Sequence, residues 1–505
     1  MPRRRALLRA AAALATLPVC AGAGRADDTL RITWRDAIPD LDPYRNQLRT
    51  GFVIAHHVWD CLVDRDPETF QIRPLLAASW RQESETAWRF ALRPDVLFHD
   101  GTPCGPEDVV YTVETICAGT GIAVPGLFTW LAGAEQVDAA TVRLTLHEPF
   151  PAALEYLAMV LPILPRAYRE RVGPDTFARA PVGTGPYRVQ PGEPHDHIRL
   201  ERFDGYFAGS PKGRPAIARL AIREVADSLA ELTDLMANRA DWIWQIGPDA
   251  YAAVAQAPGL QALRADSMRL GYLSLDAAGR SGAGTPLTDV RVRQAIWHAI
   301  DRAAIVQRLA GVAARVPDAP CFPTQFGCDA AAAQHYPYDP ARARALLAEA
   351  GYPDGFATEL VSYVLAEDSE AVRAYLQAVR IDATLTQLPT ATALARSEAG
   401  TTPLFLGSWG SYSINDVDAL LPQFFGGGPL DYARLPELEA LVTRAGASGD
   451  ADLRRGLYAQ AIRLITTQAL WLPLHTYTTT YGMTRTLNFH PFPDELPRFY
   501  LASFR

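Results

Sequence analysis

Strand-like and helix-like segments alternate through the second half of the chain, and this alternation limits the possible folds more than any other feature. Apolar residues recur at helical spacing in residues 286–311, 339–351 and 451–469. The middle segment begins with an Asp-Pro pair and ends at a glycine, as a well-capped helix does. Strand-like segments precede and separate these helices, at residues 270–276, 357–363, 382–388 and 403–409. The alternation predicts α/β lobes.

The length of the chain requires more than one such lobe. At 505 residues it is too long for a single hydrophobic core, so we expect at least two. The net charge is −8, and no run of lysine or arginine occurs outside the N-terminus, so a nucleic-acid partner is not expected. Beyond the N-terminal segment, no stretch has the roughly 18 apolar residues of a membrane helix.

The first 26 residues are typical of an export signal. A basic start that includes Arg4 and Arg5 precedes an apolar stretch and small residues, and it resembles a twin-arginine signal. Cleavage is expected after Ala23 or Ala26. Acylation of Cys20 would instead give a lipoprotein, but Val19 fits that signal poorly. We therefore expect an exported, periplasmic protein.

Five cysteines remain after such processing, so at least one thiol is unpaired. Cys321 and Cys328 either form a local disulfide or are two small buried residues, and the sequence leaves both open. Their spacing is not that of a zinc site. We predict no metal and no cofactor.

Residues 98–114, FHDGTPCGPEDVVYTVE, bring a histidine, acids and a cysteine close together. A metal or catalytic site is one interpretation. However, Gly101 and Pro103 favour a turn, and Pro106 with the acids after it favours the first turn of a helix. Because only one histidine is present, we interpret the stretch as a turn that leads into a helix.

No catalytic signature is found in the chain. It has no Gly-x-Ser-x-Gly elbow and no His-Glu-x-x-His pair, so an exported hydrolase is the less favoured hypothesis and we predict no enzyme. Residues 181–189, PVGTGPYRV, lack the spacing and the lysine of a phosphate loop. We interpret them as a tight turn.

Several motifs together resemble one known family. Spread in family order over most of the chain, they are Leu41-Asp42-Pro43, PLLAASW, RFALRPDVLFHDGTPCGPEDVVYT, PVGTGPY, LTDVRVRQAIWHAIDR and YDPARARALLAEAGY. The chain resembles family 5 of the extracellular solute-binding proteins, the peptide and nickel type that serves ATP-driven (ABC) importers.

The resemblance implies a two-lobed α/β fold, the type II periplasmic binding protein fold, with a ligand cleft between the lobes. Residues 27–271 would form lobe I, with an extra subdomain at about 67–180. Residues 272–475 would form lobe II, and 476–505 would return to lobe I. Closure of the lobes around the ligand would follow. The expected partners are a peptide or similar small solute and a membrane permease, and the protein is expected to be a monomer.

The resemblance also implies where the ligand contacts lie. The candidates lie in the loop after Leu41-Asp42-Pro43, in residues 240–249, and just before, in and just after the strand that ends at Trp409. They are Asn46, Gln47, Arg49, Thr50, Trp244, Gln245, Arg396, Trp409, Tyr412 and Asp416. The loop could equally be solvated, and Trp244 could equally belong to the core. His475 and Tyr477 near the final crossover are further candidates.

One departure from the family bears on the ligand. Peptide binders of this family place a carboxylate for the ligand amine shortly after the equivalent of Trp409, but residues 410–413 read Gly-Ser-Tyr-Ser. Either Asp416 takes this role or the ligand has no amine there. A carrier of nickel or a metal chelate is the alternative within the same fold, and His56-His57 is the only adjacent histidine pair.

Overall fold

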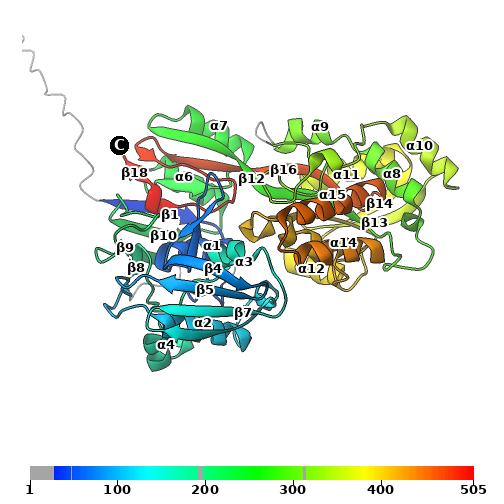
Figure 1. The fold of residues 1–505 in the computed structure, drawn as a ribbon. Coiled ribbons are helices and arrows are strands. Elements are labelled where there is room, and N and C mark those ends of the chain that lie inside the picture. The colour runs from blue at the N-terminus through cyan, green and yellow to red at the C-terminus, as the bar shows by residue number, and fades with distance from the viewer. Residues whose placement is uncertain (1–27, 47, 191–196, 311–313) are drawn as a thin grey trace, which may run out of the picture.

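A computed structural model describes residues 28–46, 48–190, 197–310 and 314–505, arranged as two lobes (Figure 1). The expected export signal at 1–26, with Cys20, lies outside the described residues, as does Gln47. Within the described parts of the chain, no helix is both long enough and apolar enough to cross a membrane.

One large mixed sheet runs through both lobes. Its strands follow the order β14 (Ile381–Gln387), β13 (Phe356–Ser362), β15 (Leu404–Trp409), β12 (Leu260–Leu275), β16 (Trp471–Thr484), β11 (Trp242–Trp244), β1 (Thr29–Trp34), β10 (Arg219–Glu224), β9 (His197–Arg202) and β8 (Tyr187–Val189).

The long antiparallel strands β12 and β16 connect the lobes (Figure 1). The first half of β12 pairs with the second half of β16 within lobe I, whereas the second half of β12 pairs with the first half of β16 and also with β15 of lobe II. The register shifts between Asp266 and Leu270 and again between Gly271 and Tyr272. These irregular residues lie where the chain passes from one lobe to the other, close to the expected boundary at 271. The exact division into 27–271, 272–475 and 476–505 stays a prediction.

Lobe I combines its half of the sheet with a smaller subdomain. The helices packed on the sheet are α1 (Arg49–Val58), α6 (Ser228–Met236) and α7 (Pro248–Gln256), and the short strands β17 (Leu487–Asn488) and β18 (Ser503–Phe504) close the C-terminal return. The subdomain contains a separate antiparallel sheet in the order β4 (Ala77–Ser84), β5 (Ala87–Leu92), β7 (Thr141–Leu146) and β6 (Leu131–Asp138). Around it lie the hairpin of β2 (Val63–Arg65) and β3 (Ile72–Pro74) and the helices α2 (Pro106–Cys117), α3 (Ala153–Val160), α4 (Arg166–Val172) and α5 (Pro174–Phe177).

Residues 98–114 form a turn followed by helix α2, as predicted. Gly101 has a φ of 86°, which favours glycine, and Asp108 accepts a hydrogen bond from the Gly105 amide at 2.9 Å to cap the helix. The His99 ring accepts from the Gly183 amide and donates to the Gly185 carbonyl, at 3.1 and 3.0 Å. Burial lowers the pKa of His99 to about 4. This histidine therefore ties two loops of lobe I together.

The glycines of residues 181–189 have a packing reason. A Cβ on Gly183 would lie 2.0 Å from the Val58 carbonyl oxygen, and one on Gly185 would lie 2.6 Å from that of His57. No real side chain fits there. The segment is a close backbone contact with the end of α1, which explains its glycines without a phosphate ligand.

Lobe II has helices on both faces of its part of the sheet. They are α8 (Val290–Ala299), α9 (Arg302–Ile305), α10 (Pro340–Glu349), α11 (Ala366–Ala378), α12 (Thr390–Glu398), α13 (Leu421–Phe425), α14 (Pro436–Gly446) and α15 (Ala451–Thr467). One core packs against α13, α14 and α15, and the other against α8, α10 and α11. Cys321 and Cys328 form a disulfide.

The single helix expected over 286–311 is wrong in its extent. Helix α8 ends at Ala299, Ile300 is extended, and Asp301 caps α9 by accepting from the Ala304 amide at 2.9 Å. The apolar residues keep their helical spacing across Asp301, but this aspartate caps a second helix and so divides the segment into two.

Candidate functional site

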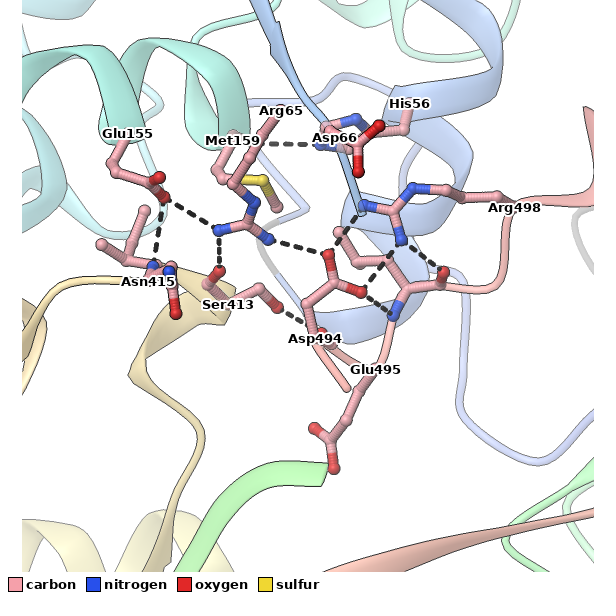
Figure 2. A network of polar contacts seen from close by, with 12 residues as sticks. His56, Arg65, Asp66, Glu155, Met159, Ser413, Asn415, Asp494, Glu495 and Arg498 are labelled. Carbon is pink, nitrogen blue, oxygen red and sulfur yellow. Dashed lines mark hydrogen bonds and ion pairs between the residues drawn. The ribbon is translucent and has the colours of Figure 1, made fainter. Parts of the chain in front are cut away.

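A buried polar network joins the two lobes, and its central residue is Arg65 at the end of β2 (Figure 2). Arg65 is only 1% exposed. Its Nη1 donates to the Ser413 carbonyl oxygen at 2.5 Å and to Glu155 at 2.9 Å. Glu155 also accepts from the Asn415 amide at 3.1 Å. Lobe I therefore holds the 413–415 segment of lobe II through charge-assisted hydrogen bonds.

Asp494, in the return segment, completes this network. It accepts from Arg65 Nη2 at 2.7 Å and from two nitrogens of Arg498 at 2.7 and 2.9 Å. Burial alone would raise the pKa of Asp494, but Arg498 and Arg65 outweigh burial and hold that pKa well below its ordinary value. The Asp494 carbonyl oxygen also accepts from the Ser413 hydroxyl at 2.6 Å. The return segment thus contacts both lobes.

A second cluster lies next to the first, and Glu495 is its centre. Glu495 Oε2 accepts from Arg269 Nη2 at 2.9 Å and from Arg49 Nη2 at 3.2 Å, and Oε1 accepts from the Ser267 hydroxyl at 2.7 Å. Burial opposes ionisation, but Arg269 and Arg49 lower the pKa of Glu495 to about 2. Arg49 also donates to the Ser413 hydroxyl, which links the two clusters.

Backbone strain is concentrated in the segment that lobe II contributes. Ser411, Tyr412 and Ser413 have φ values of 50°, 48° and 64°, and Glu495 opposite them has a φ of 59°. Non-glycine residues in this region cost about 1–3 kcal/mol each and persist where surrounding contacts require them. Such strain clusters at ligand clamps and switch segments, which makes this turn a candidate for function.

Aromatic side chains stand beside the arginines. Trp409 is half-buried, packs edge-to-face on Tyr412 at 5.2 Å, and donates its ring N–H to the Ala419 carbonyl at 3.0 Å. Tyr363 donates to the Ser408 carbonyl at 2.7 Å. Rings that are fixed in this way and still partly exposed can pack against a bound molecule.

Four of the predicted site residues are held by contacts within one lobe. Asn46 is buried and donates to the Asp40 carbonyl at 2.9 Å, and Thr50 is fully buried in α1. Trp244 packs edge-to-face against Trp34 in the core. Arg396 pairs with Glu359 on the surface of lobe II at 2.9 Å. These contacts favour a structural role.

The other predicted residues differ in their surroundings. Asp416 is 3% exposed and pairs with Arg454 at 2.9 Å, and burial raises its pKa to about 7. It therefore does not offer a free carboxylate to an amine. Gln245 is exposed in a left-handed conformation with a φ of 52°. Arg49, Trp409 and Tyr412 lie together at the contact between the lobes. Tyr477, one of the further candidates, interacts with Arg269 and Glu495 at the same contact, and burial raises its pKa.

Sequence reasoning missed most of the groups that meet there. They are Arg65, Glu155, Arg269, Ser413, Asp494, Glu495 and Arg498. None belongs to a motif with recognisable spacing. Their positions follow from the approach of the lobes.

A groove of about 890 Å³ also opens between the lobes, next to the network. Lobe I contributes Phe70 and Glu155 to its wall, whereas lobe II contributes Phe326, Asn415 and the disulfide loop. Since Glu155 and Asn415 are hydrogen-bonded to each other, the network forms one wall of this groove. The histidines of the predicted adjacent pair are elsewhere: His56 and His57 are bonded within lobe I, and burial lowers the pKa of each to about 3.

Comparison with known proteins decides the family. The model of the bacterial extracellular solute-binding proteins, family 5 (Middle), matches residues 71–431. The chain belongs to this family. The glutathione-binding protein GsiB of Salmonella typhi is 27% identical over 456 residues, which is 86% of each chain.

Solved structures agree with the fold of this solute-binding protein. HbpA2 from Haemophilus parasuis superposes with a TM-score of 0.80 at 25% identity, covering 94% of this chain and 100% of that one. DppA from Helicobacter pylori, solved in complex with the peptide STSA, gives a TM-score of 0.79 at 21% identity and covers 94% of this chain and 98% of its own. The family prediction and the two-lobed type II fold are thereby confirmed.

Membership of the family establishes the general role. Its proteins capture solutes outside the cytoplasmic membrane for ABC importers, and this chain is such a transport protein. The relatives are binding proteins and not enzymes, which supports the absence of catalysis at the level of the family.

Proposed function

We propose that this solute-binding protein captures a peptide or peptide-like small solute between its lobes and delivers it to a membrane permease. The proposal rests on the Arg65 network, whose hydrogen bonds link lobe I to the 413–415 segment of lobe II. These bonds can form only when the lobes are together. A solute that touches both lobes therefore stabilises the same closed state that these bonds stabilise.

Two relatives support a peptide-like solute. GsiB is a glutathione-binding protein, and DppA was solved with a peptide, and both match most of this chain. Within the part of the chain that the structure describes, no group of three or more His, Cys, Asp or Glu side chains is placed to hold a metal ion. Nothing there favours a carrier of free metal over a carrier of peptides.

Our candidates for contact with the solute are Arg49, Trp409 and Tyr412. Gln245, which is exposed just after β11, is a further candidate. Gln47 stays a prediction from the family pattern. Trp409 and Tyr412 would supply a ring surface that packs against side chains without selecting one identity. The proposal further includes a monomer with hinge-connected lobes at about 27–271 and 272–475, with residues 476–505 returning to lobe I. It also includes export to the periplasm, with a lipid anchor on Cys20 as the less favoured alternative.

The test combines scattering with calorimetry. Reduced glutathione and a set of dipeptides and tripeptides are titrated, and the radius of gyration is measured with and without a saturating amount of each binder. A peptide should bind and the radius should fall. Trp409→Ala should weaken binding about tenfold by loss of ring contact while the protein stays folded. If no member of the set binds, or if saturation leaves the radius unchanged, the proposal is wrong.

A further inference from the structure

We propose that Arg49 and Arg269 form a carboxylate-binding site, so that the solute is recognised at this point as an anion and not through an amine. The inference rests on the proposed function, because it names the chemical class of the solute captured between the lobes. It also answers why residues 410–413 contain no acid.

The two arginines come from separate parts of the chain and meet at one oxygen. Arg49 begins α1 of lobe I, and Arg269 lies in the irregular part of β12 where the chain passes between the lobes. Both donate an Nη2 hydrogen bond to Glu495 Oε2, at 3.2 and 2.9 Å. Glu495 thus holds the two guanidinium groups side by side, as a site for a planar anion requires.

The charges around this pair do not balance. Among the described residues, Glu495 is the only carboxylate that the side chains of Arg49 and Arg269 bond. Asp494 and Glu155 are already matched by Arg65 and Arg498. The connected network therefore contains four arginines and three carboxylates, with one positive charge in excess. In a half-buried place such a charge is unfavourable until an anion joins it.

Both guanidinium groups keep part of their surface accessible to a ligand group. The side chain of Arg269 is 31% exposed and that of Arg49 is 15% exposed, although both are engaged with Glu495. A Cβ on Gly410 would lie 3.0 Å from Arg269 Nη2 and 3.4 Å from Arg49 Nη2. Glycine at 410 therefore keeps the chain beside Trp409 clear of both guanidinium groups.

An amine would find no suitable partner at the same place. Glu495 is the nearest acid, and its two oxygens already accept from Arg269, Arg49 and Ser267. An ammonium group would also have to approach the two arginines. A carboxylate avoids both problems and gains charge-assisted hydrogen bonds.

The experiment compares the free acid of one probe with its ester. Reduced glutathione and glutathione diethyl ester are titrated by calorimetry into the wild type and into the variants Arg269→Gln, Arg269→Lys and Arg49→Gln. Arg373→Gln is the matched control, because Arg373 forms an exposed pair with Glu370 on α11 of lobe II. Thermal unfolding confirms that each variant is folded. Free dicarboxylates and sugar acids form a second set of probes.

The expected result is a coupled loss. Arg269→Gln should weaken binding of glutathione about 10- to 100-fold, as loss of a charge-assisted hydrogen bond does, and Arg269→Lys less. The diester should bind the wild type weakly, and the glutamine variants should then change its affinity less than about threefold. The control should bind both probes as the wild type does.

The outcomes separate the two proposals. If the ester or an uncharged peptide amide binds as tightly as the free acid, and Arg269→Gln has no effect, the carboxylate site is overturned while capture of peptides stands. If no peptide binds, but dicarboxylates or sugar acids do so and depend on Arg269, the carboxylate site stands and the peptide proposal is overturned.

Discussion

Two pairs of buried carboxylates in this protein have pKa values that are shifted in opposite directions. Asp494 and Glu495 lie between the lobes, and their pKa values are lowered, that of Glu495 to about 2. Asp416 and Asp418 lie within lobe II, and burial raises their pKa values to about 7 and about 6. All four are at most 9% exposed, so burial alone does not explain the difference.

The number of arginines explains it. Asp494 and Glu495 each bond two guanidinium groups. Asp416 bonds only Arg454, and Asp418 accepts a hydrogen bond from the Tyr458 hydroxyl and feels the charge of Arg454 without bonding it. The region around Asp494 and Glu495 therefore has arginine in excess, whereas the region around Asp416 and Asp418, which borders the groove from the side of lobe II, has too little. We conclude that the first region is arranged to attract negative charge and that the second serves packing.

The largest effect on stability is expected when one arginine is removed, from either of the two regions. Arg65→Ala leaves Asp494 with one arginine and removes the donor to Glu155 and to the Ser413 carbonyl. It should lower the free energy of unfolding by about 3–5 kcal/mol and should separate the lobes, because a buried charge loses its partner. Urea unfolding and solution scattering measure the two effects.

Arg454→Ala is the comparison for this variant. It breaks the pair with Asp416 and should cost a similar free energy, but it should leave the radius of gyration unchanged because the pair lies within one lobe. Equal expansion of both variants would contradict the distinction between the two regions.

A smaller effect is expected from pH, with opposite signs. The folded pKa of Glu495 lies below its ordinary 4.5, so its contribution is present above about pH 4.5 and is lost as the pH falls toward 2. Glu495→Gln should therefore be less stable than the wild type at pH 5, by about 2–3 kcal/mol, and the gap should narrow toward pH 3.

Asp418 should give the reverse trend. Its folded pKa of about 6 exceeds its ordinary 3.8, so its favourable contribution is present below pH 3.8 and is lost as the pH rises through 6. Asp418→Asn should gain stability relative to the wild type between pH 4 and pH 8. Thermal unfolding at several pH values follows both variants, and parallel curves would remove the contrast.

The smallest effect concerns one glycine of each region. A Cβ on Gly410 would press on Arg269 at 3.0 Å, and one on Gly446 would press on Asp418 Oδ1 at 3.1 Å. Both contacts are with ends of side chains, so each alanine variant should change stability by less than about 1 kcal/mol. Only Gly410→Ala should weaken binding of glutathione, roughly threefold, since it displaces a guanidinium group. Calorimetry measures the affinity of both variants for glutathione. An equal loss of affinity in Gly446→Ala would count against placing the solute beside Gly410.

Local chemistry explains which parts of the fold the sequence predicts. The helices at 339–351 and 451–469 appear as α10 and α15, each capped by the side chain of an aspartate. Capping and apolar spacing act within a few residues and can be recognised without the rest of the chain. The break of the 286–311 segment was missed because Asp301 suits the surface of a helix and the start of a new one equally well.

The sequence by itself determined the α/β lobes, the turn and helix at 98–114, and the family, because these depend on spacing, capping and motifs along the chain. Only the tertiary structure decided which arginine meets which carboxylate. Arg65 and Asp494 are 429 residues apart, and Arg269 and Glu495 are 226 apart. In PDELPR, residues 493–498, nothing distinguishes two acids that lie between the lobes from two that face water. Their ionisation depends on guanidinium groups that come close only when both lobes are folded and in contact.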